Sequence, residues 1–230
     1  PLALLAEPWM AGRRLVMLEP RRLAARAAAH YMARQLGESV GGTVGYRVRG
    51  DTRVSKHTRI EVVTEGVLAR MLSADATLDG YAAVLFDEFH ERSLDADLGL
   101  ALVLETQQVR DDLRVLVMSA TLDGEAVAQL VADARGPAPV IRSSGRMFPI
   151  TTHHRAPRSD ERMEAATSRI VRDALAECEG DVLVFLPGMG EQRRTAERLA
   201  GSVPPTVDVY VLHGSMPLDE QEAALAPAPA

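Results

Sequence analysis

Two neighbouring carboxylates near the middle of the chain, Asp87 and Glu88, are the residues whose type and position best suit chemistry. They follow a short apolar run, 82–86, and are followed by Phe89 and His90. An apolar run that stops at polar residues is typical of a strand buried on both faces of a parallel sheet. Open α/β sheets bind ligands at the carboxyl ends of such strands. Carboxylates placed there suit Mg²⁺ and a water molecule that attacks a phosphate, although a solvated turn is the simpler explanation of an isolated Asp-Glu pair.

The segments around this pair alternate between strand and helix. Apolar runs predict strands at 14–18, 43–49, 59–64, 82–86 and 114–118. Apolar residues at helical spacing predict helices at 1–10, 21–36, 65–72, 94–107 and 123–132. Such alternation favours an α/β unit with a parallel sheet and right-handed crossovers.

Turn-forming residues around 136–145 interrupt this alternation, which then resumes. Helices are expected at 161–177 and 190–200, and strands at 181–186 and 207–212. We therefore expect one parallel-sheet domain over 1–144 and the start of a second over 145–230.

The composition is that of an ordinary globular protein, with 47% hydrophobic and 25% charged residues. Nothing in the sequence resembles a signal peptide and the apolar runs are too short to cross a membrane, so a cytoplasmic location is expected. The single cysteine, Cys178, excludes an internal disulfide and a cysteine-built zinc site. We interpret it as a small apolar residue of a helix.

Basic residues are concentrated in one part of an otherwise acidic chain. The formal net charge is −6, yet eleven basic residues lie between Gly12 and Arg59 against only three acidic ones. A basic region of this kind can bind a polyanion, or it can be a solvated surface rich in arginine. Charge alone leaves both interpretations open.

Short motifs occur along the chain in an order that resembles one family. They are Pro20-Arg21-Arg22, Thr64-Glu65-Gly66, Asp87-Glu88-Phe89-His90, Ser119-Ala120-Thr121, Phe185-Leu186-Pro187-Gly188 and Leu212-His213-Gly214. With these motifs the chain resembles the DEAH-box RNA helicases of superfamily 2 over nearly its whole length. Glu91-Arg92-Ser93-Leu94, directly after the central motif, makes it look most similar to the bacterial HrpB group. The resemblance implies two RecA-like domains, with ATP and Mg²⁺ as cofactors and RNA as partner.

The resemblance also implies roles for the residues of the two central motifs. Asp87 would hold Mg²⁺, through water, and Glu88 would orient and deprotonate the water that attacks the γ-phosphate. His90 would pass the state of the nucleotide to neighbouring motifs. Ser119 and Thr121 would form hydrogen bonds near His90, although a helix-entry cap is the alternative for these two residues.

A second set of residues would contact RNA, mostly through its backbone. Arg21, Arg22 and Thr64 would bind phosphates, and Gly66 would let the two backbones approach each other. The remaining expected contacts are Pro20, Arg47, Glu65, Pro187, Gly188 and His213. Aromatic residues make up only 4% of the chain, so stacking on bases is expected to be minor. Alternatively, Arg21 and Arg22 pair with acidic neighbours such as Glu19 and only stabilise the domain.

Two motifs of the family have no counterpart in the sequence. A phosphate-binding loop needs Gly-x-x-x-x-Gly-Lys-Ser/Thr, and the only lysine, Lys56, has no glycine before it. The late family motif Gln-x-x-Gly-Arg-x-Gly-Arg is also missing. We therefore expect an internal fragment of a helicase core, with both domains incomplete, that does not hydrolyse ATP by itself.

Two other classes of protein remain possible on the sequence alone. One is a stand-alone module that binds RNA or a protein partner without ATPase activity. The other is a phosphohydrolase in which Asp87, Glu88, His90 and Glu91 form a metal cluster, which would require further ligands on other strand ends.

Overall fold

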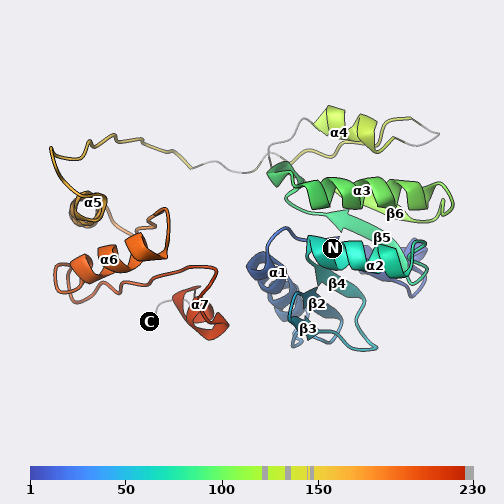
Figure 1. Cartoon of the computed structure of the whole chain (residues 1–230). Helices are drawn as coiled ribbons and strands as arrows, with labels where there is room; N and C mark the ends of the chain where they lie inside the picture. The colour runs from blue at the N-terminus through green and yellow to red at the C-terminus, as the bar shows by residue number, and fades with distance from the viewer. Residues whose placement is uncertain (121–123, 133–135, 144, 146–147, 226–230) are drawn as a thin grey trace. The chain divides into compact units, whose positions relative to one another are not determined.

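The structure, a computed structural model, divides the chain into two units, Pro1–Ser144 and Gly145–Ala230, and each is described by itself (Figure 1). It describes all residues except 121–123, 133–135, 144, 146–147 and 226–230. Within the described residues, no helix is both long enough and apolar enough to span a membrane.

The first unit is built on a six-stranded sheet with the order β3-β2-β4-β1-β5-β6 (Figure 1). The strands are β1 (Arg14–Leu18), β2 (Val44–Val48), β3 (Asp51–Arg53), β4 (Ile60–Val63), β5 (Tyr81–Phe86) and β6 (Arg114–Val117). Every neighbouring pair in this sheet is parallel except β2 and β3. The predicted α/β class is confirmed, as are the five strands predicted for this unit.

Helices cover both faces of the sheet, which is why its central strands are almost entirely apolar, with Glu61 of β4 as a buried exception. They are α1 (Arg22–Gln35), α2 (Glu65–Ala74) and α3 (Leu94–Gln107). A further helix, α4 (Gly124–Leu130), comes after β6 in the chain. Ala29 and Met32 of α1 pack with Leu15, Met17 and alternate residues of the neighbouring strands on one face. The intervening strand residues pack with α2 and α3 on the other face, so strand alternation assigns each apolar residue to one of two cores.

Two local predictions are wrong. Residues 1–10 form two short 3₁₀ helices, Leu2–Ala6 and Pro8–Met10, rather than one helix. Pro8 has no N–H to continue a helix and keeps Glu7 extended, at φ −70° and ψ 134°. Strand β3, which was not predicted, is short and polar, and it exists because it pairs with β2 as a hairpin.

The second unit contains α5 (Met163–Glu177), α6 (Met189–Leu199) and α7 (Leu218–Leu225). The predicted helices 161–177 and 190–200 are confirmed. The strands predicted at 181–186 and 207–212 are wrong, because the structure assigns no strand to either segment. Leu183 and Phe185 are 78% and 86% exposed. A strand requires a hydrogen-bonded neighbour, and within the described part of this unit these segments pair with none.

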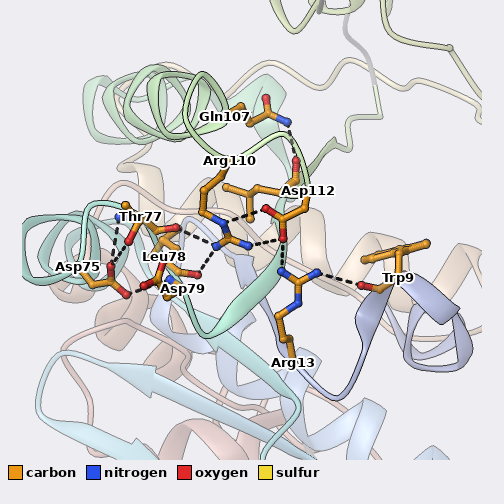
Figure 2. Close-up of polar contacts among 10 residues, drawn as sticks. Trp9, Arg13, Asp75, Thr77, Leu78, Asp79, Gln107, Arg110 and Asp112 are labelled. Atoms are coloured by element: carbon orange, nitrogen blue, oxygen red, sulfur yellow. Dashed lines mark hydrogen bonds and ion pairs between the residues drawn. The ribbon is translucent and has the colours of Figure 1, made fainter.

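A polar cluster centred on Arg110 closes the edge of the sheet where β1, β5 and β6 begin (Figure 2). Arg110 donates hydrogen bonds to the carbonyl oxygens of Thr77 and Leu78, at 2.9 and 2.7 Å, and forms an ion pair with Asp112. Asp112 also accepts a hydrogen bond from Arg13. The two arginines hold the pKa of Asp112 well below its ordinary range. Three loops that precede parallel strands are thereby tied together.

Candidate nucleotide and nucleic-acid site

The carboxyl ends of β4, β1, β5 and β6 bring four of the motifs to one edge of the sheet. The backbone N–H groups of Glu19, Asp87 and Met118 each donate to the last carbonyl of the neighbouring strand, at 2.9, 3.0 and 2.8 Å. The hydrogen bonding between strands thus continues one residue past the ends of β1, β5 and β6. The motifs that follow these strands are far apart in the sequence, yet each one begins beside the next at the same edge of the sheet. Ligand sites in parallel sheets are built in this way.

Asp87, Glu88 and His90 lie directly after β5. One Asp87 oxygen, Oδ1, accepts a hydrogen bond from the backbone N–H of Glu88 at 2.9 Å. His90 Nδ1 lies 3.3 Å from Glu88 Oε2 and has no hydrogen-bond partner among the described residues. His90 thus lies beside the Glu88 carboxylate without a hydrogen bond to it, while Asp87 keeps a partly exposed carboxylate at the strand end.

The backbone around Glu88 is under strain. Glu88 has a left-handed conformation, with φ 48° and ψ 34°, and a short 3₁₀ helix, η3 (Phe89–Glu91), follows it. Phe89 donates its backbone N–H to the carbonyl of Met118 at 3.1 Å, which ties this turn to the end of β6. A residue other than glycine in this region costs free energy and is most often found at functional sites. The left-handed conformation of Glu88 turns the chain sharply after Asp87, and the Glu88 side chain is exposed.

Glu19 is an acidic residue of this site that the sequence did not single out. It follows β1, beside Asp87, and is only 5% exposed. Burial raises its pKa to about 8, and the charge of Asp87 and a hydrogen bond with it add to this shift. Glu19 therefore keeps its proton to a higher pH than an ordinary glutamate, which lowers the negative charge of the site.

The Ser-Ala-Thr motif is only partly described. Ser119 follows β6 and is exposed, one residue beyond the Met118 carbonyl that Phe89 contacts. The hydrogen bond expected between Ser119 and the neighbourhood of His90 stays a prediction. Thr121 lies outside the described residues.

Arg21 and Arg22 stand at the start of α1. Arg21 Nη2 lies 3.1 Å from Glu91 Oε1, so Arg21 pairs with the segment after β5 and not with Glu19. Arg22 is exposed and has no ion-pair partner among the described residues. The first turn of α1 contains no acidic residue, so the partial positive charge of the helix start adds to that of the arginines. This place is electropositive and suits an anion, and Pro20 fixes the chain that enters it.

Thr64, Glu65 and Gly66 form the start of α2. Thr64 occupies the N-cap position, yet within the described chain its side chain makes no capping hydrogen bond and stays available. Glu65 accepts a hydrogen bond from the Ser93 hydroxyl at 2.5 Å, while the Ser93 oxygen caps α3 by accepting from the Ala96 N–H at 3.0 Å. The fold does not require glycine at 66, because a Cβ there would meet no atom within 4 Å.

Arg47 does not join this group through any contact that the structure shows. It lies on β2, and its Nε donates to Glu61 Oε2 at 2.7 Å. Glu61 is fully buried and also accepts a hydrogen bond from Arg14 at 2.6 Å. Arg47 thus balances a buried charge, and its side chain is still 38% exposed.

The other expected contacts, Pro187, Gly188 and His213, belong to the second unit. Gly188 is the N-cap of α6, in an extended conformation. His213 Nδ1 accepts a hydrogen bond from the backbone N–H of Ser215 at 3.2 Å and lies 2.9 Å from Ser215 Oγ.

The chain is similar over its whole length to known helicases. It is 46% identical to the ATP-dependent RNA helicase HrpB of Escherichia coli over 230 residues, which is all of this chain and 28% of that protein. This chain is homologous to a segment of the DEAH-box RNA helicases. A crystal structure of the E. coli DEAH/RHA helicase HrpB gives a TM-score of 0.87 at 45% identity, over all of this chain and 29% of that one.

A more distant helicase supports the same relationship. A probable ATP-dependent RNA helicase, the DHX35 homolog of Caenorhabditis elegans, is 33% identical over 241 residues, again all of this chain and 33% of that protein. No family model matches the chain. By these coverages, the chain spans about a third or less of the length of the DEAH-box relatives that it matches.

In this DEAH-box homologue, Asp87 is the residue that fits Mg²⁺. Its half-buried carboxylate has one oxygen engaged by a backbone N–H and offers a hard ligand at a strand end. Mg²⁺ needs only one or two protein carboxylates when phosphates and water complete its shell. The described residues contain no group of three or more acidic, histidine or cysteine side chains that could hold a metal ion by themselves.

Sequence reasoning on the DEAH-box motifs missed two functional candidates, Glu19 and Ser93. Glu19 directly follows a buried strand and stands at the same position relative to its strand as Asp87, which was a usable signal. Ser93 lies in the tetrapeptide that distinguished the HrpB group, but its contact with Glu65 is 28 residues away in sequence and no local pattern indicates it.

Proposed function

We propose that this chain is part of an ATP-dependent RNA helicase core, which couples ATP hydrolysis to RNA binding and to remodelling or unwinding. In this proposal residues 1–144 are the first RecA-like, ATP-binding domain and residues 145–230 begin the second. The observation that carries the proposal is the meeting of two sets of residues at one sheet edge. The residues expected to act on ATP and those expected to bind RNA follow adjacent parallel strands. Arg21 and Glu65 of the RNA set contact Glu91 and Ser93, which directly follow the Asp87–His90 motif.

The hydrolytic step would depend on Asp87, Glu88 and His90. Asp87 would hold Mg²⁺, which supplies positive charge against the phosphates when bound. Glu88, exposed at the sharp turn, would take the proton of the attacking water, and His90 Nδ1, 3.3 Å away, would keep its carboxylate oriented. Glu19, protonated beside Asp87, would limit the repulsion among carboxylates before a cation binds.

RNA would bind across the starts of α1 and α2. Arg21 and Arg22 would contact phosphates, with the start of α1 adding its partial positive charge. The free Thr64 hydroxyl would bond a further phosphate, and the open space at Gly66 would admit the RNA backbone. Such contacts read no bases, so binding should tolerate many sequences. Glu65 belongs to the same helix start, and the exposed part of Arg47 would give a further contact in the first unit. In the second unit, Pro187, Gly188 and His213 would contact RNA.

An assay of RNA-stimulated ATP hydrolysis tests the proposal. We expect the whole protein to hydrolyse ATP with Mg²⁺ and to do so faster when single-stranded RNA of mixed sequence is added. The 230-residue chain alone, which has no phosphate-loop motif, should show no turnover and no tight ATP binding by calorimetry. Hydrolysis by the whole protein that is indifferent to RNA, or absent, would contradict the proposed function. We also propose that the protein acts in the cytoplasm.

A further inference from the structure

The contact between Arg21 and Glu91 uses the same donors that an RNA phosphate would need. Arg21 Nη2 lies 3.1 Å from Glu91 Oε1, and Arg21 Nε donates to Glu91 Oε2 at 3.2 Å. Two side-by-side contacts form the fork through which a guanidinium binds either a carboxylate or a phosphate. Glu91 therefore occupies Arg21 in the way that RNA would.

The pair is accessible and can be displaced. The Arg21 side chain is 73% exposed even while Glu91 holds it. Exposed ion pairs contribute little, because water and salt compete with them and two long side chains must be ordered. A phosphate that approaches Arg21, with Arg22 beside it, can replace the carboxylate without any change in the fold.

Glu91 is also joined to the residue expected to activate water. Its backbone N–H donates to the Glu88 carbonyl at 2.9 Å, within the single turn that carries both side chains. Left-handed residues bound this turn, Glu88 at φ 48° and Arg92 at φ 44°. The contact that Glu91 makes with Arg21 therefore holds one end of a short, strained turn that begins at Glu88.

We propose that Glu91 is an internal competitor of RNA for Arg21. Without RNA it holds Arg21 and orients it, and an RNA phosphate displaces it. The inference rests on the proposed function, because it describes how Arg21 of that site binds RNA. Glu91 is then a positioning residue that acts through Arg21 and lowers the affinity for RNA. When Glu91 releases Arg21, the turn that carries Glu88 loses this contact.

A double-mutant cycle measures this competition directly. The affinity of the 230-residue chain for a fluorescein-labelled oligouridine is followed by anisotropy. Glu91→Gln keeps the shape of the side chain and removes its charge, so we expect tighter binding by roughly 1.5- to 5-fold, the strength of an exposed ion pair. In an Arg21→Ala background the same substitution should lose this gain, because no guanidinium is left to release.

The matched control is Asp97→Asn. Asp97 forms a similar two-point ion pair with Arg92, at 3.1 and 2.8 Å, so its removal takes one negative charge from the same region without freeing Arg21. Any gain seen with Asp97→Asn measures general electrostatic attraction, and the gain with Glu91→Gln should exceed it. Glu91→Ala, which removes the charge through a different side chain, should reproduce the gain.

The outcomes separate this inference from the proposed function. If the unmodified chain binds RNA, but Glu91→Gln changes the affinity no more than Asp97→Asn, the competition does not exist. The same conclusion follows if Glu91→Gln acts equally with and without Arg21. If the unmodified chain binds no RNA at all, the proposed function fails, and this inference fails with it.

Discussion

Glu19 directly follows β1 and Asp87 directly follows β5, so these two carboxyl groups are neighbours at one edge of the parallel sheet. Burial, followed by the charge of Asp87, raises the pKa of Glu19 from 4.5 to about 8. Two adjacent carboxyl groups with different protonation can serve different roles, one as a ligand for a cation and the other as a neutral neighbour.

The raised pKa of Glu19 makes stability depend on pH. Between about pH 4.5 and 8 the folded state keeps a proton that the unfolded state loses, so the free energy of unfolding should fall as the pH rises through this window. Glu19→Gln cannot ionise and should abolish the decline, which leaves the variant more stable at pH 8 by on the order of a few kcal/mol. Urea denaturation of the chain at a series of pH values measures both curves.

A second variant separates the causes of this shift. Asp87→Asn removes the neighbouring charge but not the burial, so the decline should end at a lower pH than in the unmodified chain. A level curve for the unmodified chain, or the same decline in Glu19→Gln, would show that Glu19 is already ionised in the folded state.

Glu88→Gln in the whole protein should leave ATP binding intact and lower turnover. Glutamine keeps the shape of the side chain but cannot accept the proton of the attacking water, and the loss of a general base typically costs about 10²–10⁴-fold in rate. Glu105→Gln, an exposed position on α3 away from the motifs, is the control and should retain full turnover. Hydrolysis by Glu88→Gln within a few-fold of the unmodified enzyme would assign the base elsewhere.

Replacement of Arg21 and Arg22 by alanine should weaken RNA binding about equally for all sequences. Phosphates carry no base information, and each arginine that no longer neutralises a phosphate of single-stranded RNA reduces the slope of log affinity against log salt by roughly 0.7, or about 1.4 for both. Titration at several salt concentrations gives the slope. An unchanged slope together with a lower melting temperature would instead assign both arginines to the stability of the domain.

Gly66→Ala should affect RNA binding and stability in opposite directions. A Cβ at 66 meets no atom within 4 Å, and alanine favours a helix, so the chain should be as stable as before or gain up to about 1 kcal/mol. If the RNA backbone passes there, affinity should fall by at least about fivefold, the lower range of an overpacking cost. Unchanged affinity would remove Gly66 from the RNA surface.

Gly45→Ala is the contrasting variant for Gly66→Ala. A Cβ at 45 would lie 2.3 Å from the carbonyl oxygen of Arg53, so the β2–β3 hairpin would have to shift. We expect a loss of about 1–3 kcal/mol or more in the free energy of unfolding. Chemical denaturation of the two glycine variants side by side distinguishes a glycine that the fold needs from one that it does not.

Local patterns predicted the first unit because its strands are buried on both faces. The apolar run before Asp87 is typical of a central strand. In the helices that follow the strands, apolar residues recur at helical spacing, because one side of each helix packs on the sheet. Residues 181–186 carry a similar apolar pattern, but a strand is defined by its neighbour and not by its own sequence. That is why the prediction failed at Phe185 and succeeded at Phe86.

The candidate site was predictable where residues follow strands, and not where side chains meet across elements. Asp87, Ser119 and Thr64 lie beyond strand ends that the pattern located. The Arg21–Glu91 pair spans 70 residues and the Ser93–Glu65 contact spans 28, and these partners are set by how α1, α2 and η3 are oriented. The pKa of Glu19 depends on the same tertiary neighbours, so composition could not indicate it.

The place of Trp9 gives this protein a built-in optical probe. Trp9 is the only tryptophan of the chain, its carbonyl accepts a hydrogen bond from Arg13 at 3.1 Å (Figure 2), and Arg114 lies 5.9 Å from its ring. Tryptophan fluorescence, excited at a wavelength that tyrosine does not absorb, therefore follows the unfolding of the first unit only, whereas circular dichroism at helical wavelengths sums over both units. If the two signals change at different temperatures, the units melt independently, and one sample provides a separate melting curve for the half that carries the candidate site.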